Sequence, residues 1–196
     1  MADGIQLKAF SVGPMDNNVY ILIDPATNES ILFDAPTDAQ RILRELNGTR
    51  VKYILMTHAD GDHWQALQEV RERTGAPVGI HPAEADRLPA RPDFELSDNR
   101  TFELGGKELK AMYTPGHSPG GMSFLLDDIL IAGDTLFPGG PGNTQRPDGN
   151  FEQIIDSIRS KLFVLPDNTR VYPGHGQPTT IGAEKPHLQE WIDRGW

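Results

Sequence analysis

Residues 57–64 read Thr57-His58-Ala59-Asp60-Gly61-Asp62-His63-Trp64 and directly follow the apolar run 51–56. Four side chains that can bind a metal fall where a buried strand is predicted to end and a helix to begin. Loops at the carboxyl ends of strands are where α/β folds place their sites, because the scaffold is rigid and the loop can bend around a ligand. A helix N-cap would explain one of the two carboxylates, but not two that lie between two histidines. The stretch therefore predicts a metal-binding loop.

The composition limits the classes of partner. With 196 residues, the chain is expected to form a single domain, 1–196, with a substantial core. Eighteen basic residues against 28 acidic ones give a net charge of -10, and no basic run occurs, so nucleic acid and anionic membranes are poor partners. Since cysteine is absent, any metal must be held by imidazole and carboxylate. We expect a small-molecule substrate; the sequence does not predict the oligomeric state.

No targeting signal is expected from the first residues of the sequence. Residues 1–5 lack the basic and apolar regions of a signal peptide, and no apolar segment approaches the ~18 residues of a membrane span. We expect a cytoplasmic protein.

Hydrophobic periodicity and turn residues predict alternating strands and helices. Strands are predicted over 5–12, 18–23, 30–33, 51–56, 78–80, 102–104, 107–113, 122–126, 129–132 and 169–172, the first three as an antiparallel meander. Helices are predicted over 38–46, 62–73, 82–88, 151–162 and 183–193. Residues 89–99 are expected to be a surface connection, and the Gly- and Pro-rich segment 137–150 a lid or substrate loop. Strands in two sets, interspersed with helices, favour two packed sheets with helices outside.

Three further segments place a potential ligand where a strand gives way to a glycine-containing turn. They are 114–120 with His117, 132–135 with Asp134, and 172–176 with His175. His81 and His187 do not occupy such positions, and neither is expected to have a direct role, as is usual for a surface or packed histidine.

In this order, the residues resemble the signature of the metallo-β-lactamase superfamily, His-x-His-x-Asp-His followed by a distant His, Asp and His. The resemblance covers nearly the whole chain. Within the superfamily, the chain looks most like the glyoxalase II (hydroxyacylglutathione hydrolase) branch. The segments that carry this second likeness are Thr114-Pro115-Gly116-His117-Ser118-Pro119-Gly120, Gly133-Asp134-Thr135-Leu136-Phe137 and Thr179-Thr180-Ile181-Gly182.

The resemblance implies an α/β fold, an αββα four-layer sandwich of two mixed sheets flanked by helices, with metal ions at one edge between the sheets. It implies one or two zinc ions, with iron or manganese possible because oxygen ligands suit them. Carried over position by position, His58, Asp60 and His117 would hold one ion, Asp62, His63 and His175 the other, and Asp134 would bridge them.

Asp60 departs from the family pattern, which has histidine at this position. A carboxylate can bind zinc at about 2.0–2.2 Å, but its side chain is shorter than that of histidine. Either the loop moves inward or Asp60 binds through water. In the related flavodiiron branch, an acidic residue at this position binds iron, so we expect Asp60 to be a ligand. Its extra negative charge would make the metal a weaker Lewis acid.

The implied activity is metal-dependent hydrolysis of a thioester or another activated ester by a metal-bound hydroxide. Asp62 would act in catalysis by orienting that hydroxide besides binding metal. No Gly-x-Ser-x-Gly elbow is present, so a serine nucleophile is not expected. Asn143 and Arg146 of the long loop are candidate substrate-binding residues, and Arg146 could meet a substrate carboxylate, although a solvated loop arginine is an equally good interpretation.

Three alternatives stay open. One is a mononuclear iron persulfide dioxygenase, a related branch whose ligands match His58, His117 and Asp134. Another is a non-catalytic metal-binding module whose site is altered at Asp60, and the third is a set of caps and turns that binds no metal. Full-length glyoxalase II members carry a C-terminal domain that helps bind glutathione, whereas about twenty residues follow His175 here. A small acyl thioester or a lactone is therefore also a candidate substrate.

Overall fold

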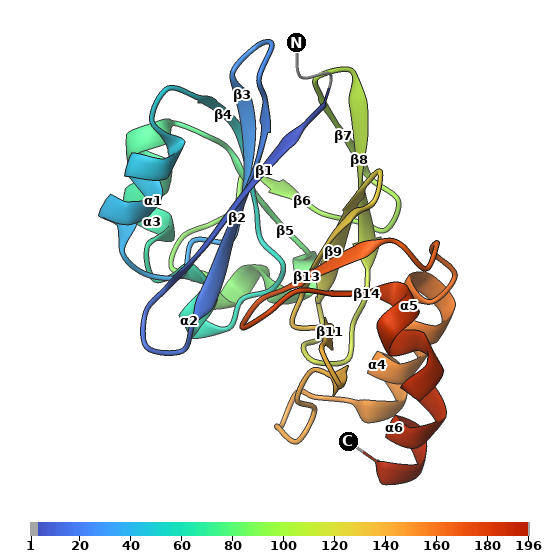
Figure 1. Ribbon diagram of the computed structural model, residues 1–196. Coiled ribbons are helices and arrows are strands. Elements are labelled where there is room, and N and C mark those ends of the chain that lie inside the picture. Colours follow the sequence, from blue (N-terminus) through green and yellow to red (C-terminus); the bar gives the residue numbers. More distant parts are fainter. Residues whose placement is uncertain (1–3, 196) are drawn as a thin grey trace.

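The computed structural model describes residues 4–195, which form two six-stranded sheets packed face to face with helices on both outer sides (Figure 1). Residues 1–3, on which part of the prediction about a targeting signal rests, lie outside the described residues. None of the helices in the described chain is long and apolar enough to cross a membrane.

The first sheet contains the N-terminal strands in their order along the chain. They are β1 (Gln6–Val12), β2 (Asn17–Asp24), β3 (Glu29–Phe33), β4 (Arg50–Leu55), β5 (Val78–Ile80) and β6 (Phe94–Glu95). The first three form the predicted antiparallel meander, and β3 to β6 run parallel to one another.

The second sheet has the order β14-β13-β10-β9-β8-β7. Its members are β7 (Thr101–Leu104), β8 (Lys107–Tyr113), β9 (Met122–Leu126), β10 (Ile129–Gly133), β13 (Arg170–Pro173) and β14 (Thr179–Thr180). Only β10 and β13 pair in parallel. A small hairpin of β11 (Leu136–Phe137) and β12 (Gly140–Pro141) follows β10. Both sheets are therefore mixed, as predicted.

The helices form the outer layers. Their bounds are α1 (Ala39–Leu46), α2 (Gly61–Trp64), α3 (Leu67–Thr74), the 3₁₀ turn η1 (Pro82–Arg87), α4 (Phe151–Ser157), the π-helical η2 (Ile158–Leu162), α5 (Ile181–Glu184), the 3₁₀ turn η3 (Lys185–His187) and α6 (Leu188–Arg194). Figure 1 shows α1 and α3 beside the first sheet and α4 and α6 beside the second.

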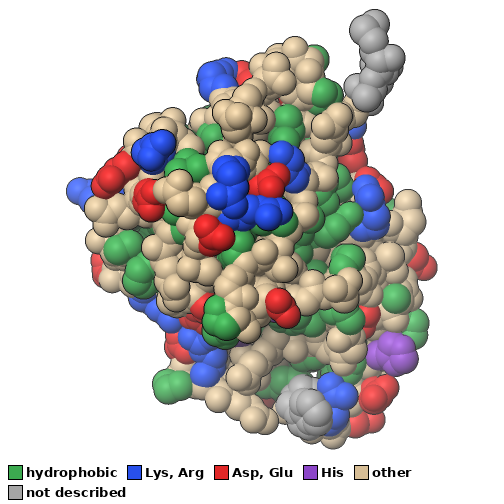
Figure 2. All heavy atoms as spheres, turned by 60° about the vertical axis from the view of Figure 1, so that its left-hand side comes forward, with side chains coloured by type: hydrophobic (Ala, Val, Ile, Leu, Met, Phe, Trp, Pro, Cys, Tyr) green, Lys and Arg blue, Asp and Glu red, His purple; other side chains and the backbone are tan. Residues whose placement is uncertain are grey.

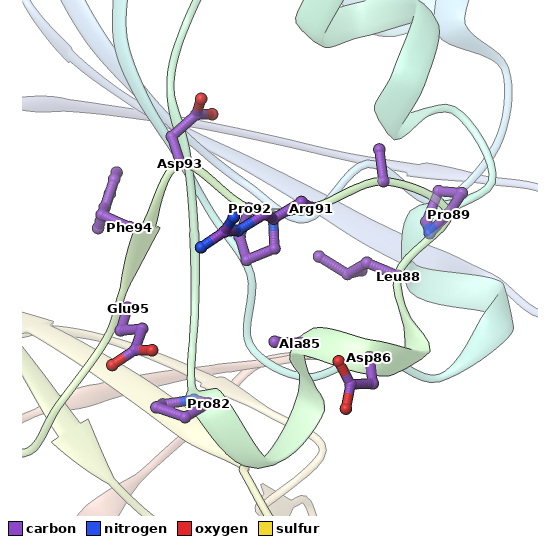
Figure 3. Close-up of a pocket in the computed structure, with 11 residues that line it drawn as sticks. Pro82, Ala85, Asp86, Leu88, Pro89, Arg91, Pro92, Asp93, Phe94 and Glu95 are labelled. Carbon is purple, nitrogen blue, oxygen red and sulfur yellow. The ribbon is translucent and has the colours of Figure 1, made fainter.

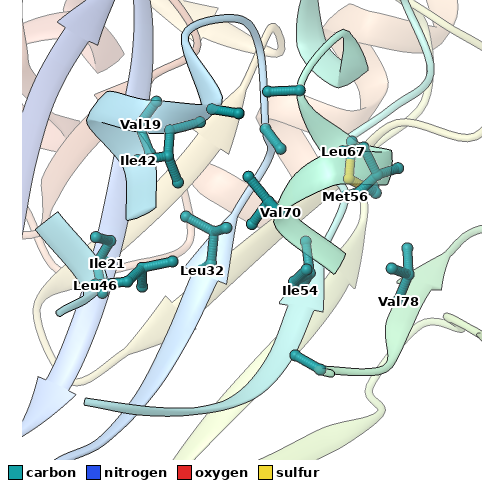
Figure 4. Close-up of a cluster of buried hydrophobic side chains, with 14 of the residues drawn as sticks. Val19, Ile21, Leu32, Ile42, Leu46, Ile54, Met56, Leu67, Val70 and Val78 are labelled. Carbon is teal, nitrogen blue, oxygen red and sulfur yellow. The ribbon is translucent and has the colours of Figure 1, made fainter. Parts of the chain in front are cut away.

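Strand β2 shows why the layers stack in this way. Val19 and Ile21 pack toward the helices, in a cluster that includes Ile42 of α1 and Val70 of α3 (Figure 4). Tyr20 and its neighbours of the same parity face the second sheet instead. Because side chains alternate along a strand, a strand that is apolar on both faces must be covered on both sides. A third cluster joins the second sheet to α4 and α6.

The predicted helix 62–73 is interrupted. It consists of α2 and α3, separated by Gln65 and Ala66. The amide of Ala66 donates to the carbonyls of Ala35 and Pro36, at 3.0 and 2.9 Å, instead of continuing the helical ladder. The break therefore comes from the loop after β3, which apolar periodicity does not reveal.

Other boundaries differ for related reasons. The segment 82–88 is a 3₁₀ turn rather than an α-helix, the predicted helix 151–162 ends in a π-helical turn, and the predicted terminal helix 183–193 consists of three short pieces. The connection 89–99 contributes the two-residue strand β6, held at the sheet edge by Asp93, whose carboxylate and amide both bond Val78. A two-residue strand is too short to show a pattern.

The carboxyl ends of β4, β8, β10 and β13 lead into the loops that carry the predicted ligands. In the second sheet, β8 is antiparallel to β9 and β9 to β10, so β8, β10 and β13 run in the same direction. Their ends consequently lie at one rim, next to the loop after β4.

Candidate metal centre

The predicted ligands converge at this rim. Three overlapping sets each have their ligand atoms within 4.8 Å of one another, and they are His58, His63 and Asp134; His58, Asp60 and His117; and Asp62, His63 and His175. Residues more than a hundred positions apart are thus brought together, as the metal-site interpretation requires.

The half formed by Asp62, His63 and His175 offers the nitrogen and oxygen atoms that can coordinate a metal. His63 bonds Asp34 through Nδ1 at 3.0 Å, and His175 bonds the Met15 carbonyl through Nδ1 at 2.9 Å. Each partner is an acceptor, so each Nδ1 carries hydrogen, and in the neutral ring each Nε2 offers a lone pair. The two Nε2 atoms lie 3.3 Å apart, and Asp62 Oδ2 lies 3.3 Å from that of His175. Acceptors gathered in this way fit a shared cation.

Two buried atoms beside this half lack a partner. The Nε2 of His58 and the Oδ1 of Asp134 make no hydrogen bond within residues 4–195. Buried polar atoms without a partner are costly, so such a pair in a cluster of ligands fits a divalent ion. The Asp134 carboxylate can occupy its position because residue 174 is glycine: a Cβ there would lie 2.0 Å from Asp134 Oδ1.

The charges of the site favour its cationic form. Burial alone would lower the pKa of His63, but the carboxylates of Asp134 and Asp34 outweigh burial and raise it to about 9. Hydrogen bonds to Asp134 and Asp62 raise the pKa of His175 to about 10. The bond to His175 in turn holds the pKa of Asp62 well below its usual range. Protons therefore take the place of a metal in this half.

Asp60 has different partners. It is the N-cap residue of α2, yet its side chain makes no capping bond. Arg146 donates to the carboxylate from both terminal nitrogens: Nη2 lies 2.7 Å from Oδ1, and Nη1 bonds Oδ2. Arg87 Nη2 adds a third bond to Oδ1 at 2.8 Å. The carboxylate also lies 3.2 Å from His117 Nε2 and 3.6 Å from His58 Nε2.

The two arginines belong to a larger ionic network. Asp148 bonds Arg146 Nε at 2.7 Å and Arg87 Nη1 at 3.0 Å, and the buried Glu84 bonds Arg87 Nη1 at 2.9 Å. Burial opposes ionisation of Asp60, but the hydrogen bond from Arg146 is the largest of the effects that hold its pKa far below the usual range. Asp60 therefore remains a carboxylate.

The two candidate substrate residues occupy this part of the rim. The carbonyl of Asn143 accepts a bond from His117 Nδ1 at 2.8 Å, while its side chain accepts from the amide of Gln145 within the loop. Arg146 faces the ligands rather than solvent alone, with Nη1 3.2 Å from His117 Nε2.

His81 and His187, for which no direct role is expected, are not members of the three ligand sets. His81 stacks on Tyr113, with ring centroids 4.4 Å apart. His187 is exposed and pairs with Glu190.

Several supporting residues were not anticipated from the sequence. Asp34 accepts bonds from His63 and from both the amide and hydroxyl of Thr57, and Asn17 donates to Asp62 at 2.8 Å. Glu84 accepts from the amides of Ala59 and Gly120, which tie two ligand loops together. Asp34 directly follows a buried strand, and this position at a strand's carboxyl end was the signal available.

A large hollow lies elsewhere on the surface. It has a volume of about 720 Å³, and Figure 3 shows its lining between η1 and β6, including Ala85 and Leu88. None of the predicted ligands lines it, so the hollow is not the ligand cluster. On the face in Figure 2, basic side chains gather near the centre with acidic side chains beside them.

Comparison with known proteins adds independent evidence. The sequence pattern of the Metallo-beta-lactamase superfamily matches residues 12–175, which include every predicted ligand. The chain belongs to the metallo-β-lactamase superfamily. It is 35% identical to the probable metallo-hydrolase YqgX of Bacillus subtilis (strain 168), over 91% of this chain and 93% of the relative. It is 29% identical to the hydroxyacylglutathione hydrolase GloC of Haemophilus influenzae, over 92% and 95% of the two chains.

Solved structures confirm the four-layer fold. The structure of BLEG-1, a B3 metallo-beta-lactamase, has a TM-score of 0.87 at 30% identity, covering 93% of this chain and 98% of that one. ETHE1 from Myxococcus xanthus has a TM-score of 0.85 at 29% identity, covering 93% and 83%. TTHA1623 in a di-iron-bound form has a TM-score of 0.79 at 28% identity, covering 91% and 96%. Proteins with this fold therefore differ in name, and one of them is di-iron-bound.

Proposed function

We propose that this member of the metallo-hydrolase superfamily hydrolyses thioesters or other activated esters of small molecules. The observation that carries the proposal is the half-site of Asp62, His63 and His175, with the orphaned oxygen of Asp134 beside it. A divalent ion held there, zinc in the first instance, would acidify a water molecule and polarise a substrate carbonyl.

The chain's own residues supply orientation and charge. Asn17 Nδ2 holds one oxygen of Asp62, whose lowered pKa keeps it a hydrogen-bond acceptor for an attacking water at neutral pH. Arg146, on the loop at the rim, presents a guanidinium beside His117. Because its N–H groups are already bonded to Asp60 and Asp148, it would act on a negatively charged substrate through its positive charge rather than through a bidentate bond.

The length of the chain gives no argument against a glutathione thioester. GloC bears the name hydroxyacylglutathione hydrolase, and the alignment covers 95% of it and 92% of this chain. A protein of about this size therefore carries that name. A hydroxyacylglutathione is accordingly the first substrate to test, with small acyl thioesters and lactones next.

The test compares substrates on one preparation loaded with zinc. We expect kcat/KM to be highest for a thioester, lower for a lactone and lowest for a β-lactam, and a chelator to abolish turnover. Asp134→Asn should lower kcat at least 100-fold, whereas Asp24→Asn, a buried aspartate that bonds the turn at Thr27, should leave kcat unchanged. Absence of turnover on every ester in the panel would overturn the proposal.

A second candidate, an iron-dependent dioxygenase acting on a persulfide, is favoured by one observation. Asp60 is held by two arginines, while His117 Nε2 lies 3.6 Å from Asp134 Oδ2 and the Nε2 of His58 is unpartnered. Two histidines and one carboxylate are the ligand set of many mononuclear iron oxygenases. Oxygen uptake by iron-loaded protein on a persulfide, without thioester turnover, would support this candidate instead.

A further inference from the structure

The half of the centre formed by His58, Asp60 and His117 already contains a cation from the protein. We infer that the Arg146 guanidinium takes the place of a metal ion in this half, so that the protein binds one metal ion, in the half formed by Asp62, His63 and His175. The inference concerns the number and place of the ions. It is compatible with hydrolysis of any of the esters above, but not with an iron ion held by His58, His117 and Asp134.

The hydrogen-bond partner of His117 fixes its tautomer. Its Nδ1 lies 2.8 Å from the carbonyl of Asn143, which can only accept, so Nδ1 carries the hydrogen. The Nε2 of a neutral His117 is then an acceptor. Asp60 Oδ2 lies 3.2 Å away and can only accept, so in this tautomer the contact requires a donor or a cation shared by the two atoms.

Arg146 supplies that donor. Its Nη1 bonds Asp60 Oδ2 and lies 3.2 Å from His117 Nε2, so one N–H group contacts two of the three ligand atoms of this half. A zinc ion would have to lie about 2.0–2.2 Å from these same two atoms. The guanidinium and the ion would then compete for the same lone pairs, and two cations only a few ångströms apart repel each other.

The surrounding network keeps the guanidinium in place. Arg146 engages Asp60 through both terminal nitrogens, a bidentate geometry that an ammonium group could not reproduce. Asp148 bonds Arg146 Nε, and Arg87 bonds both Asp148 and Asp60. The side chains of Asp60, Arg87, Arg146 and Asp148 are 14–35% exposed. Displacing Arg146 would therefore leave several largely buried charges without their partner at once.

The exchange at position 60 fits this arrangement. Histidine has no oxygen pair with which to bind the two terminal nitrogens of a guanidinium, whereas a carboxylate does. The shorter aspartate also leaves room for the arginine. Asp60 is therefore an anchor for Arg146 rather than a direct metal ligand, which differs from the role expected from the sequence.

The experiment counts and locates the ions. Metal-free protein is titrated with Co²⁺, followed by absorption, and zinc content is measured after dialysis. We expect one equivalent for the wild type and for Arg159→Gln, an exposed arginine of η2. The double variant Asp60→His/Arg146→Gln should bind two, because it restores an imidazole and removes the competing cation. Two equivalents of comparable affinity in the wild type, or one in a folded double variant, would overturn the inference.

A second measurement needs no variant. Anomalous diffraction at the zinc edge should show one peak in wild-type crystals, bounded by Asp62, His63 and His175. A peak bounded by His58, Asp60 and His117 would overturn the inference even if every substituted protein failed to fold. Neither readout involves turnover, so failure of the proposed hydrolase activity would leave this result intact.

Discussion

Asp34 is the residue that most strongly organises the ligands without being one of them. Its Oδ2 accepts bonds from both His63 Nδ1, at 3.0 Å, and the Thr57 hydroxyl, at 2.7 Å. Thr57 Oγ1 lies in turn 2.9 Å from His58 Nδ1. One buried carboxylate thus orients two imidazoles, a role that outer carboxylates commonly have around metals.

Replacing Asp34 with asparagine should weaken zinc binding by about 10- to 100-fold, the usual effect of losing such a partner. The measurement is competition with a chromophoric chelator. Asp24→Asn is the matched control, because Asp24 is also buried but its carboxylate bonds only the turn at Thr27 and its neighbours. Equal affinities for wild type and Asp34→Asn would contradict the role assigned to Asp34.

Alanine substitutions at two glycines of the ligand loops should have different effects on zinc affinity. A Cβ at Gly174 would lie 2.0 Å from Asp134 Oδ1 and 2.9 Å from His63 Cε1, whereas one at Gly61 would meet nothing within 4 Å. Gly174→Ala should therefore displace Asp134 and lower zinc affinity at least tenfold, as measured by calorimetric titration. Gly61→Ala, which lies between two predicted ligands, should bind zinc like the wild type; a loss there equal to that of Gly174→Ala would refute the steric argument.

At the scale of elements, the 3₁₀ turn η1 joins loops that come from different sheets. Its Glu84 is fully buried, and its two carboxylate oxygens accept from Ala59, in the loop after β4, and from Gly120, in the loop after β8. The loop that carries His58 and the loop that carries His117 are thereby held together. Their separation is thus set by a turn that contributes no ligand.

Glu84→Ala should accordingly lower both stability and zinc affinity. Each buried amide left without a partner costs about 1–3 kcal/mol, which denaturant unfolding of the metal-free protein will measure. Glu184→Ala is the matched control, since Glu184 is also buried and accepts from Gly139 and Thr179. Both variants should be destabilised, but only Glu84→Ala should bind zinc more weakly; an unchanged affinity would show that the loops are positioned by other contacts.

At the scale of the whole molecule, stability is coupled to the state of the centre. The pKa values of His63 and His175 are raised to about 9 and about 10, against about 6.5 for an unfolded histidine. A group whose pKa is higher in the folded state stabilises that state fully below the unfolded value, and the stabilisation is lost as pH rises through the folded value. The relevant window is therefore about pH 6.5 to 10.

The Tm of metal-free protein should consequently fall from pH 6.5 to pH 10, and zinc should remove most of that fall because the ion replaces the protons. Differential scanning calorimetry with and without zinc will measure this. His175→Gln should show a smaller fall in its metal-free form. A metal-free Tm that stays level or rises across the window would contradict the assigned charges.

The sequence by itself determined the chemistry and the layers. The types and order of the ligands, from His58 to His175, are local facts, and they predicted a metal centre at strand ends. Strands grouped in two sets, interspersed with helices, favoured two packed sheets, and the resemblance to the family implied the four-layer arrangement. Periodicity carries this information because burial follows the repeat of each element.

Only the tertiary structure decided what each polar residue contacts. The break at Ala66 depends on carbonyls of the loop after β3, and the partners of Asp60 come from positions 87 and 146. Such contacts join segments that are distant in the chain, and a hydrogen bond or ion pair leaves no periodic trace in either segment. For this reason the sequence indicated that Asp60 was unusual, and the fold showed that two arginines hold it.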